Sequence, residues 1–208
     1  MTERWLGNQK EEKMKRIRKN QGFTLVEIMI VVAIIALLAA IAIPNLLRSR
    51  MAANESAAIA ACKTFAEAQD IYRRTDWDSD GVLEYSLAIS GNNSLYEKNA
   101  GSGNLTLVDA AFATAEGQPG TAQPKAGYVF TVLTGQGANA PGGTKNYVVG
   151  SNMTLGYACS GTPASYDGTG RNSFQINNTG TVYQKDQGSG VTTHITTYNP
   201  DTGWVVSE

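Results

Sequence analysis

The sequence is poor in the residues that most often build metal centres and redox sites. Its 208 residues include one histidine, His194, and two cysteines, Cys62 and Cys159, which lie too far apart for the usual zinc or thiol motifs. It also lacks a phosphate-binding glycine loop, a G-x-S-x-G motif and a repeat of fixed period. The sequence therefore offers no catalytic constellation, and His194 is expected to be an ordinary surface or strand residue.

Excess positive charge is missing from most of the chain. Residues 1–22 carry seven Lys and Arg against three Glu, so the remainder carries 17 − 7 = 10 basic and 18 − 3 = 15 acidic side chains. The net charge of −5 after residue 22 excludes the composition typical of a nucleic-acid-binding surface. Glycine and small polar residues dominate beyond residue 90, which is typical of a loop-rich β domain outside the cytoplasm.

One long apolar run covers residues 23–43 and contains only two polar residues, Thr24 and Glu27. A helix rises about 1.5 Å per residue, so this run spans roughly 30 Å, one hydrocarbon core of a bilayer. The basic residues before it place the N-terminus in the cytoplasm. A cleaved secretory signal has a shorter core and a small-residue cleavage site. A plain signal anchor fits the length, but it gives Glu27 no purpose unless the carboxylate merely snorkels to the interface.

A processing motif stands at the start of this run. Residues 18–27, RKNQGFTLVE, resemble the prepilin signature of type IV pilins and type II secretion pseudopilins. The resemblance implies that a prepilin peptidase removes the leader, residues 1–22, by cutting after Gly22. It also implies that Phe23 becomes a methylated N-terminus, so the mature chain would have 208 − 22 = 186 residues.

Cleavage would give Glu27 a purpose. The new amine on Phe23 is cationic and lies at the end of an apolar helix. When such helices bundle, the amine of one subunit and Glu27 of a neighbour neutralise one another, whereas either group alone would be an unpaired charge in a medium of low dielectric constant. Glu27 is therefore interpreted as an assembly residue and not as a catalyst.

The resemblance implies a structural subunit of a type IV pilus-like filament, and no enzyme. Its expected partners are other copies of itself, the prepilin peptidase, the assembly machinery and the bacterial inner membrane, and no nucleic acid. The precursor would lie in that membrane with a cytoplasmic N-terminus, and the mature protein in an extracellular filament at the cell surface. Two alternatives stay open: a periplasmic pseudopilin of a type II secretion system, and a membrane-anchored extracytoplasmic binding module.

The expected fold is α+β and pilin-like. Pro44 ends the membrane-spanning and filament-core segment, and it predicts a kink or a local loosening of the helix; in pilins a proline near this point coincides with a segment that unwinds in filaments. Apolar residues at helical spacing continue to Tyr72, so we expect one helix over about residues 23–74. Its second half, within residues 44–75, is amphipathic and should pack on a β-rich head, residues 76–208.

The head is predicted to hold an antiparallel sheet of about four or five strands. The segments rich in β-branched and aromatic residues are 127–134, 145–150, 154–159, 173–177 and 181–185. Asn178-Thr179-Gly180 predicts a hairpin between the last two. A short helix is expected over residues 105–115, and loops over 91–104, 116–126 and 135–144.

The two cysteines allow two interpretations. Cys62 lies on the apolar side of the predicted helix, and Cys159 lies in a predicted strand. In an oxidising compartment they are expected to form a disulfide, which would add roughly 4–5 kcal/mol in the chain-entropy model. The alternative is a pair of buried thiols.

An acidic loop follows the predicted helix. The sequence DWDSDG, residues 76–81, matches the first half of a calcium-binding loop, with Glu84 at its ninth position. Its twelfth position is Leu87 where a bidentate Glu is expected, and the segment lies outside a helix pair. Two interpretations stay open: an acidic turn that ends the helix, or a calcium site with four candidate carboxylates, Asp76, Asp78, Asp80 and Glu84, and backbone carbonyls completing the shell.

Overall fold

The computed structural model describes residues 22–97, 105–189 and 195–207. The predicted leader before Gly22 and the residue His194 lie outside these ranges. The contacts within the chain divide it into two units, Met1–Ile43 and Pro44–Glu208, and each is considered by itself.

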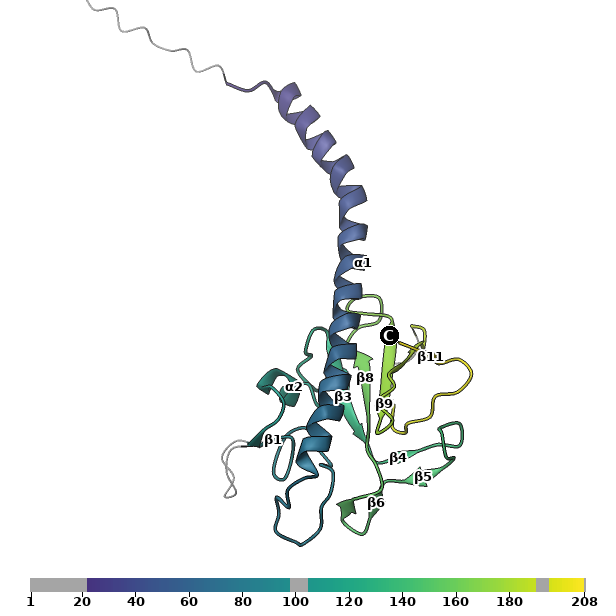
Figure 1. The fold of residues 1–208 in the computed structure, drawn as a ribbon. Helices are drawn as coiled ribbons and strands as arrows, with labels where there is room; N and C mark the ends of the chain where they lie inside the picture. The colour runs from purple at the N-terminus through teal and green to yellow at the C-terminus, as the bar shows by residue number, and fades with distance from the viewer. Residues whose placement is uncertain (1–21, 98–104, 190–194, 208) are drawn as a thin grey trace, which may run out of the picture. The chain divides into compact units, whose positions relative to one another are not determined.

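Helix α1 begins at Leu25 and ends at Tyr72, as the sequence predicted to within two residues (Figure 1). This helix is long and apolar enough to span a membrane. The helix runs through Pro44 without a break in its secondary structure. Proline removes one backbone hydrogen bond, and the strong helix formers on both sides of Pro44 keep the neighbouring turns helical. The local loosening of the helix that was predicted at Pro44 does not interrupt α1 in the structure.

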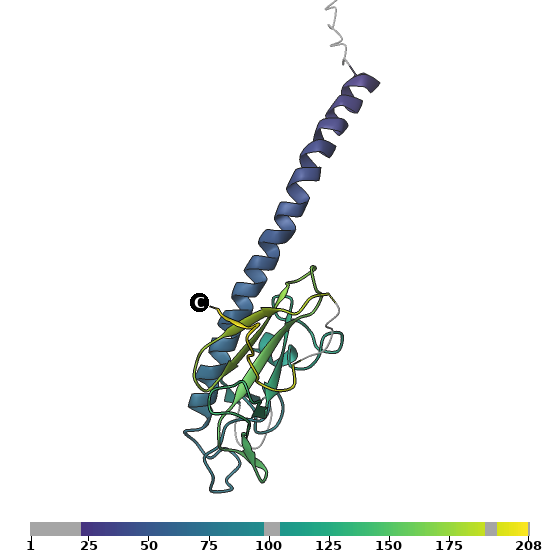
Figure 2. The ribbon, with the colours of Figure 1, turned by 90° about the vertical axis from the view of Figure 1, so that its right-hand side faces the viewer.

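The second unit is built on a five-stranded antiparallel sheet of order β11-β10-β9-β8-β3. The bounds are Tyr128–Leu133 for β3, Ala158–Pro163 for β8, Asn172–Asn177 for β9, Tyr183–Asp186 for β10 and Val205–Val206 for β11. The C-terminal part of α1 lies along one face of this sheet (Figures 1 and 2). The predicted α+β fold, with a long helix on an antiparallel sheet, is confirmed.

The core of this unit forms where α1 meets the sheet. The helix buries one face, with Cys62 and Phe65 fully inaccessible to solvent, against sheet residues such as Phe130 and Phe174. Phe65 meets the ring of Tyr157 edge to face, with 5.9 Å between the ring centroids. Burial of such large apolar side chains contributes about 1.5–3 kcal/mol each, so this interface is the main source of stability of the unit.

Smaller elements surround the sheet. Helix α2, Ala110–Thr114, is capped by the side chain of Asp109. In the described residues, three pairs of short strands form two-stranded ribbons. Strand β1 (Tyr96–Glu97) pairs with β2 (Leu105–Thr106), and β4 (Gly135–Gln136) pairs with β5 (Lys145–Asn146). Strand β6 (Val148–Val149) pairs with β7 (Asn152–Met153).

Three local predictions were wrong. Residues 145–150 are not one strand: they divide at Tyr147 between β5 and β6, since the Asn146 side chain accepts a hydrogen bond from Val148 N. The strand predicted at 154–159 begins only at Ala158, because Gly156 has φ +151°, and it continues to Pro163. The helix predicted at 105–115 is confined to α2.

Candidate functional site

The predicted cleavage position lies just before helix α1. Gly22 and Phe23 are exposed and precede the first helical residue, Leu25. No atom lies within 4 Å of the position that a Cβ on Gly22 would take. The peptide bond that a peptidase would cut is thus free of steric cover from the described part of the chain.

Thr24 and Glu27 cap the first turn of α1. Glu27 Oε2 accepts hydrogen bonds from Thr24 N and Thr24 Oγ1, both at 2.8 Å, and Glu27 N donates to Thr24 Oγ1 at 3.1 Å. This reciprocal arrangement is a capping box, and it satisfies backbone donors that the start of a helix leaves unpaired. The sequence analysis missed this role of Thr24, although the T-x-x-E pattern before an apolar run is its known signal.

The apolar segment after this cap is uncovered. Phe23 is 83% exposed, and every large apolar side chain from Leu25 to Ile43 is at least half exposed. Soluble proteins rarely leave such a continuous apolar surface in water. The segment therefore requires lipid or other apolar helices around it.

The structure brings three of the four predicted calcium ligands together. Carboxylate oxygens of Asp76, Asp78 and Asp80 lie within 4.8 Å of one another, and Glu84 is not in this group. Asp76 Oδ2 accepts a hydrogen bond from Gly81 N at 2.9 Å, which lowers the pKa of Asp76, and Gly81 has φ +85°. The loop therefore folds around its first carboxylate with the glycine turn that the motif requires.

Glu84 lies beside this group in a less solvated position. Its Oε2 is buried and has no hydrogen-bond partner in the described part of the chain. Burial raises the pKa of Glu84, and the negative charges of Asp78 and Asp80 raise it further. Calcium on this loop stays a prediction, and the uncompensated oxygen of Glu84 is compatible with it.

The two cysteines are both buried and carry free thiols in the structure. Cys62 lies on α1 and Cys159 on β8, at the interface of the helix and the sheet. Burial raises the pKa of Cys62 to about 12 and also that of Cys159. Such thiols are protonated and unreactive at neutral pH. The predicted disulfide between them stays a prediction.

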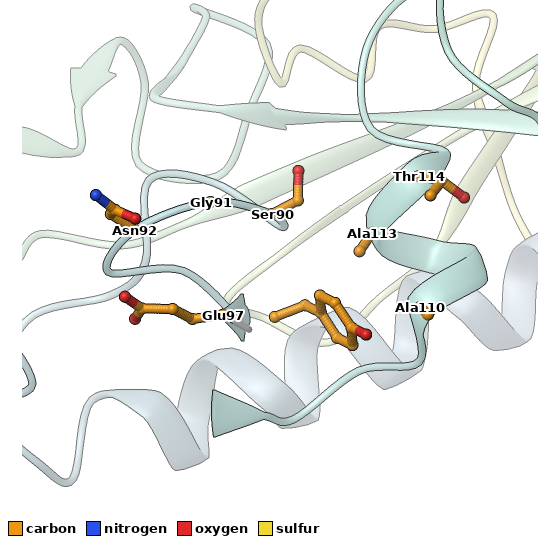
Figure 3. Close-up of a pocket in the computed structure, with 8 residues that line it drawn as sticks. Ser90, Gly91, Asn92, Glu97, Ala110, Ala113 and Thr114 are labelled. Carbon is orange, nitrogen blue, oxygen red and sulfur yellow. The ribbon is translucent and has the colours of Figure 1, made fainter. Parts of the chain in front are cut away.

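A hollow of about 460 Å³ lies between α2 and the loop that precedes β1 (Figure 3). Two of its hydroxyl groups are already engaged: Ser90 Oγ donates to Glu116 Oε2 at 2.7 Å, and Thr114 Oγ1 donates to Ala111 O at 3.1 Å. Glu97 accepts a hydrogen bond from Asn93 N at 3.1 Å. These groups hold the loop and the helix in place, and Figure 3 shows that the two hydroxyls do not point toward Glu97.

Comparisons with known proteins agree with the N-terminal geometry. Residues 39–206 match the family described as "Protein of unknown function (DUF2950)", and residues 17–43 match the prokaryotic N-terminal methylation motif. This chain belongs to the DUF2950 family and has the N-terminus of a type IV pilin or pseudopilin. The motif spans Gly22, Phe23 and Glu27, the residues that the sequence analysis singled out.

The similar proteins include two pilus proteins and one secretion-system protein. The DUF2950 chain is 40% identical over 95 residues to the type IV major pilin protein PilA of Myxococcus xanthus, which is 45% of this chain and 43% of that protein. It is 46% identical over 57 residues to the type IV wide pilus major component PilA4 of Thermus thermophilus; these residues are 27% of this chain and 44% of that protein. It is 40% identical over 60 residues to the type II secretion system core protein G of Vibrio cholerae; these residues are 29% of this chain and 41% of that protein.

The chain thus spans less than half the length of these curated relatives. No solved structure matches it significantly. The predicted family is confirmed, and the relatives are named as pilins and a secretion core protein, not as enzymes.

Proposed function

We propose that the chain is the structural subunit of a type IV pilus-like filament. It is made as an inner-membrane precursor, cut by a prepilin peptidase after Gly22, methylated at Phe23 and polymerised through helix α1. One observation carries this proposal: nothing in the described part of the chain covers the apolar segment of residues 23–43. Lipid covers it in the precursor, and copies of the same helix cover it in the filament.

The carboxylate of Glu27, at the start of α1, determines the axial stagger between neighbouring subunits. Glu27 Oε2 is used by Thr24, and in the described chain Oε1 accepts no hydrogen bond, so it is available to the amine of Phe23 on a neighbouring subunit. Axial staggers that separate these two groups leave an amine or a carboxylate unpaired among apolar side chains. The pair therefore selects one stagger, and its role is structural and not catalytic.

One feature favours a pilus over a secretion pseudopilus. Two of the similar proteins are pilus components, one of them 40% identical over 95 residues. A periplasmic pseudopilin is the second candidate, supported by the likeness to the secretion core protein G.

Deletion of the gene in its host tests this proposal. We expect surface filaments that bind an antibody against the head, that disappear in the deletion strain and that return with the wild-type gene. Unchanged surface filaments, together with loss of secreted proteins, would assign the chain to the secretion system. Unchanged filaments with unchanged secretion would overturn the filament proposal.

A further inference from the structure

Two arginines follow the apolar segment closely. Arg48 and Arg50 lie five and seven residues after Ile43, in helix α1, and both are exposed. At about 1.5 Å per residue their Cα atoms are within roughly 11 Å of the end of the apolar run along the chain. The polar headgroup layer on each side of the hydrocarbon core is about 5–8 Å thick. Guanidinium groups on long side chains at these positions therefore reach lipid phosphates while the run spans the membrane.

A groove of about 270 Å³ lies beside the first of these arginines. Its lining residues belong to α1, except for one on the segment that leads into β9: Arg48, Met51, Ala52, Glu55 and Arg171. Arg171 contacts Asp167 through Nε, which holds its side chain in place and leaves the two terminal nitrogens of the guanidinium for another partner. Two arginines from segments far apart in sequence thus line one groove together with Met51 and Ala52.

The carboxylate in the groove is already satisfied by the sheet. Glu55 Oε1 accepts hydrogen bonds from Arg171 N at 2.9 Å and Asn172 N at 3.2 Å, and Oε2 accepts from Asn172 Nδ2 at 3.1 Å. These donors disperse its negative charge. Arg48, in contrast, makes no ion pair with any residue that the structure describes. In the groove, Arg48 is thus a cation without an ion-pair partner among the described residues, while both carboxylate oxygens of Glu55 are engaged in hydrogen bonds.

We propose that this groove binds the phosphate of a phospholipid headgroup in the leaflet that Arg48 faces before the subunit is assembled. Planar guanidinium groups match the oxygens of a phosphate in pairs, and Met51 and Ala52 fit the glycerol and upper acyl carbons. The inference rests on the proposed function, because it needs α1 to span a membrane. The lipid would hold the head at the membrane surface, and the contact would be lost when the subunit leaves the membrane for the filament.

Native mass spectrometry of the mature chain in detergent micelles tests this proposal. Phosphatidylglycerol and phosphatidylcholine are added in turn, and the fraction of lipid-bound protein is measured. One basic residue near an anionic surface contributes a factor of about five in affinity. We expect Arg48→Gln/Arg171→Gln to lose about tenfold or more of phosphatidylglycerol binding. The matched control, Lys63→Gln/Arg74→Gln, removes two exposed charges, one from α1 and one from the turn that follows it, and should bind like the wild type.

Three results would overturn the lipid assignment: equal binding by both double variants, equal loss in both, or displacement of the lipid by millimolar inorganic phosphate with a phosphate adduct in its place. The last result would make the groove a site for free phosphate. The assay needs no filament, so a failure here is distinct from a failure of the proposed function. Loss of surface filaments in the deletion strain tests that function separately.

Discussion

Glu27 Oε2 receives two hydrogen bonds from one residue, Thr24 N and Thr24 Oγ1, each at 2.8 Å. The carboxylate therefore stabilises the start of its own helix, and it leaves Oε1 for a neighbour. An N-terminal carboxylate also interacts favourably with the helix dipole. Glu27 thus has a role within the isolated subunit in addition to the proposed charge pair between subunits.

Substitution of Glu27 by Ala separates these two roles. Loss of the cap costs about 1 kcal/mol of helix stability, which a membrane-spanning helix of this length tolerates. Membrane insertion and cleavage should therefore continue, while filament yield falls at least tenfold because the Phe23 amine has no partner. Yield is measured by immunoblot of the sheared surface fraction, with Glu67→Ala as a control on the exposed side of the same helix. Normal filament yield from Glu27→Ala would refute the neutralisation account.

A large charged residue in place of Gly22 tests the predicted position of peptidase cleavage. Gly22→Glu should leave an uncut precursor in the membrane, since a peptidase that recognises the small residue before the scissile bond has no space for a carboxylate. Gly7→Glu places the same residue elsewhere in the predicted leader and should be processed normally. The two forms differ by 22 residues and separate on a gel. Efficient processing of Gly22→Glu would show that the cut lies elsewhere.

Thiol labelling distinguishes the two interpretations of the cysteines. Burial keeps Cys62 and Cys159 from reacting in the folded chain in either case. After denaturation without reductant, a disulfide leaves no site for iodoacetamide, and free thiols take up two labels. We expect no label in protein from the oxidising side of the membrane. Cys62→Ser should then expose one reactive thiol, and two labels on the wild type would establish buried free thiols.

Calcium binding is tested at Glu84. Its folded-state pKa is raised, so its contribution to stability is present in acid and is lost as the pH rises through that pKa. A divalent cation would offset this loss. Glu84→Gln should therefore raise the unfolding temperature in EDTA at pH 7 and weaken the stabilisation by calcium. Glu67→Gln serves as the control in both thermal scans.

The tryptophan within the loop provides a direct readout of the same site. Trp77 lies between Asp76 and Asp78 in the sequence, so excitation of its indole should sensitise the emission of bound terbium, which replaces calcium in oxygen sites. Calcium should quench this emission by competition. A triple Asp→Asn variant at positions 76, 78 and 80 should lose the terbium emission. Emission as strong in this variant as in the wild type would contradict the calcium prediction.

The long elements could be predicted from sequence because their signals are local. The apolar run and its amphipathic continuation define α1 by periodicity alone, and the Asn178-Thr179-Gly180 turn places β9 against β10. The short ribbons could not be predicted, because a strand of two residues such as β11 has no period to detect. Its pairing with β10 depends on tertiary contacts.

The candidate sites likewise include parts that the local sequence determines and parts that depend on tertiary contacts. Asp76, Asp78 and Asp80 converge because the spacing and Gly81 set the loop locally. The position of Glu84 depends on how the following chain packs; it lies outside the group of three aspartates, and its role as a calcium ligand stays a prediction. The groove beside Arg48 joins α1 to the segment before β9, 116 residues apart at Glu55 and Arg171, so no sequence pattern could reveal it.

Intact mass and N-terminal fragmentation of the protein purified from its host test the central claim most directly. The account predicts a chain of 186 residues, from 208 − 22, that begins with methylated Phe23. A chain that retains residues 1–22 would contradict it, because the amine that Glu27 is proposed to neutralise would not exist.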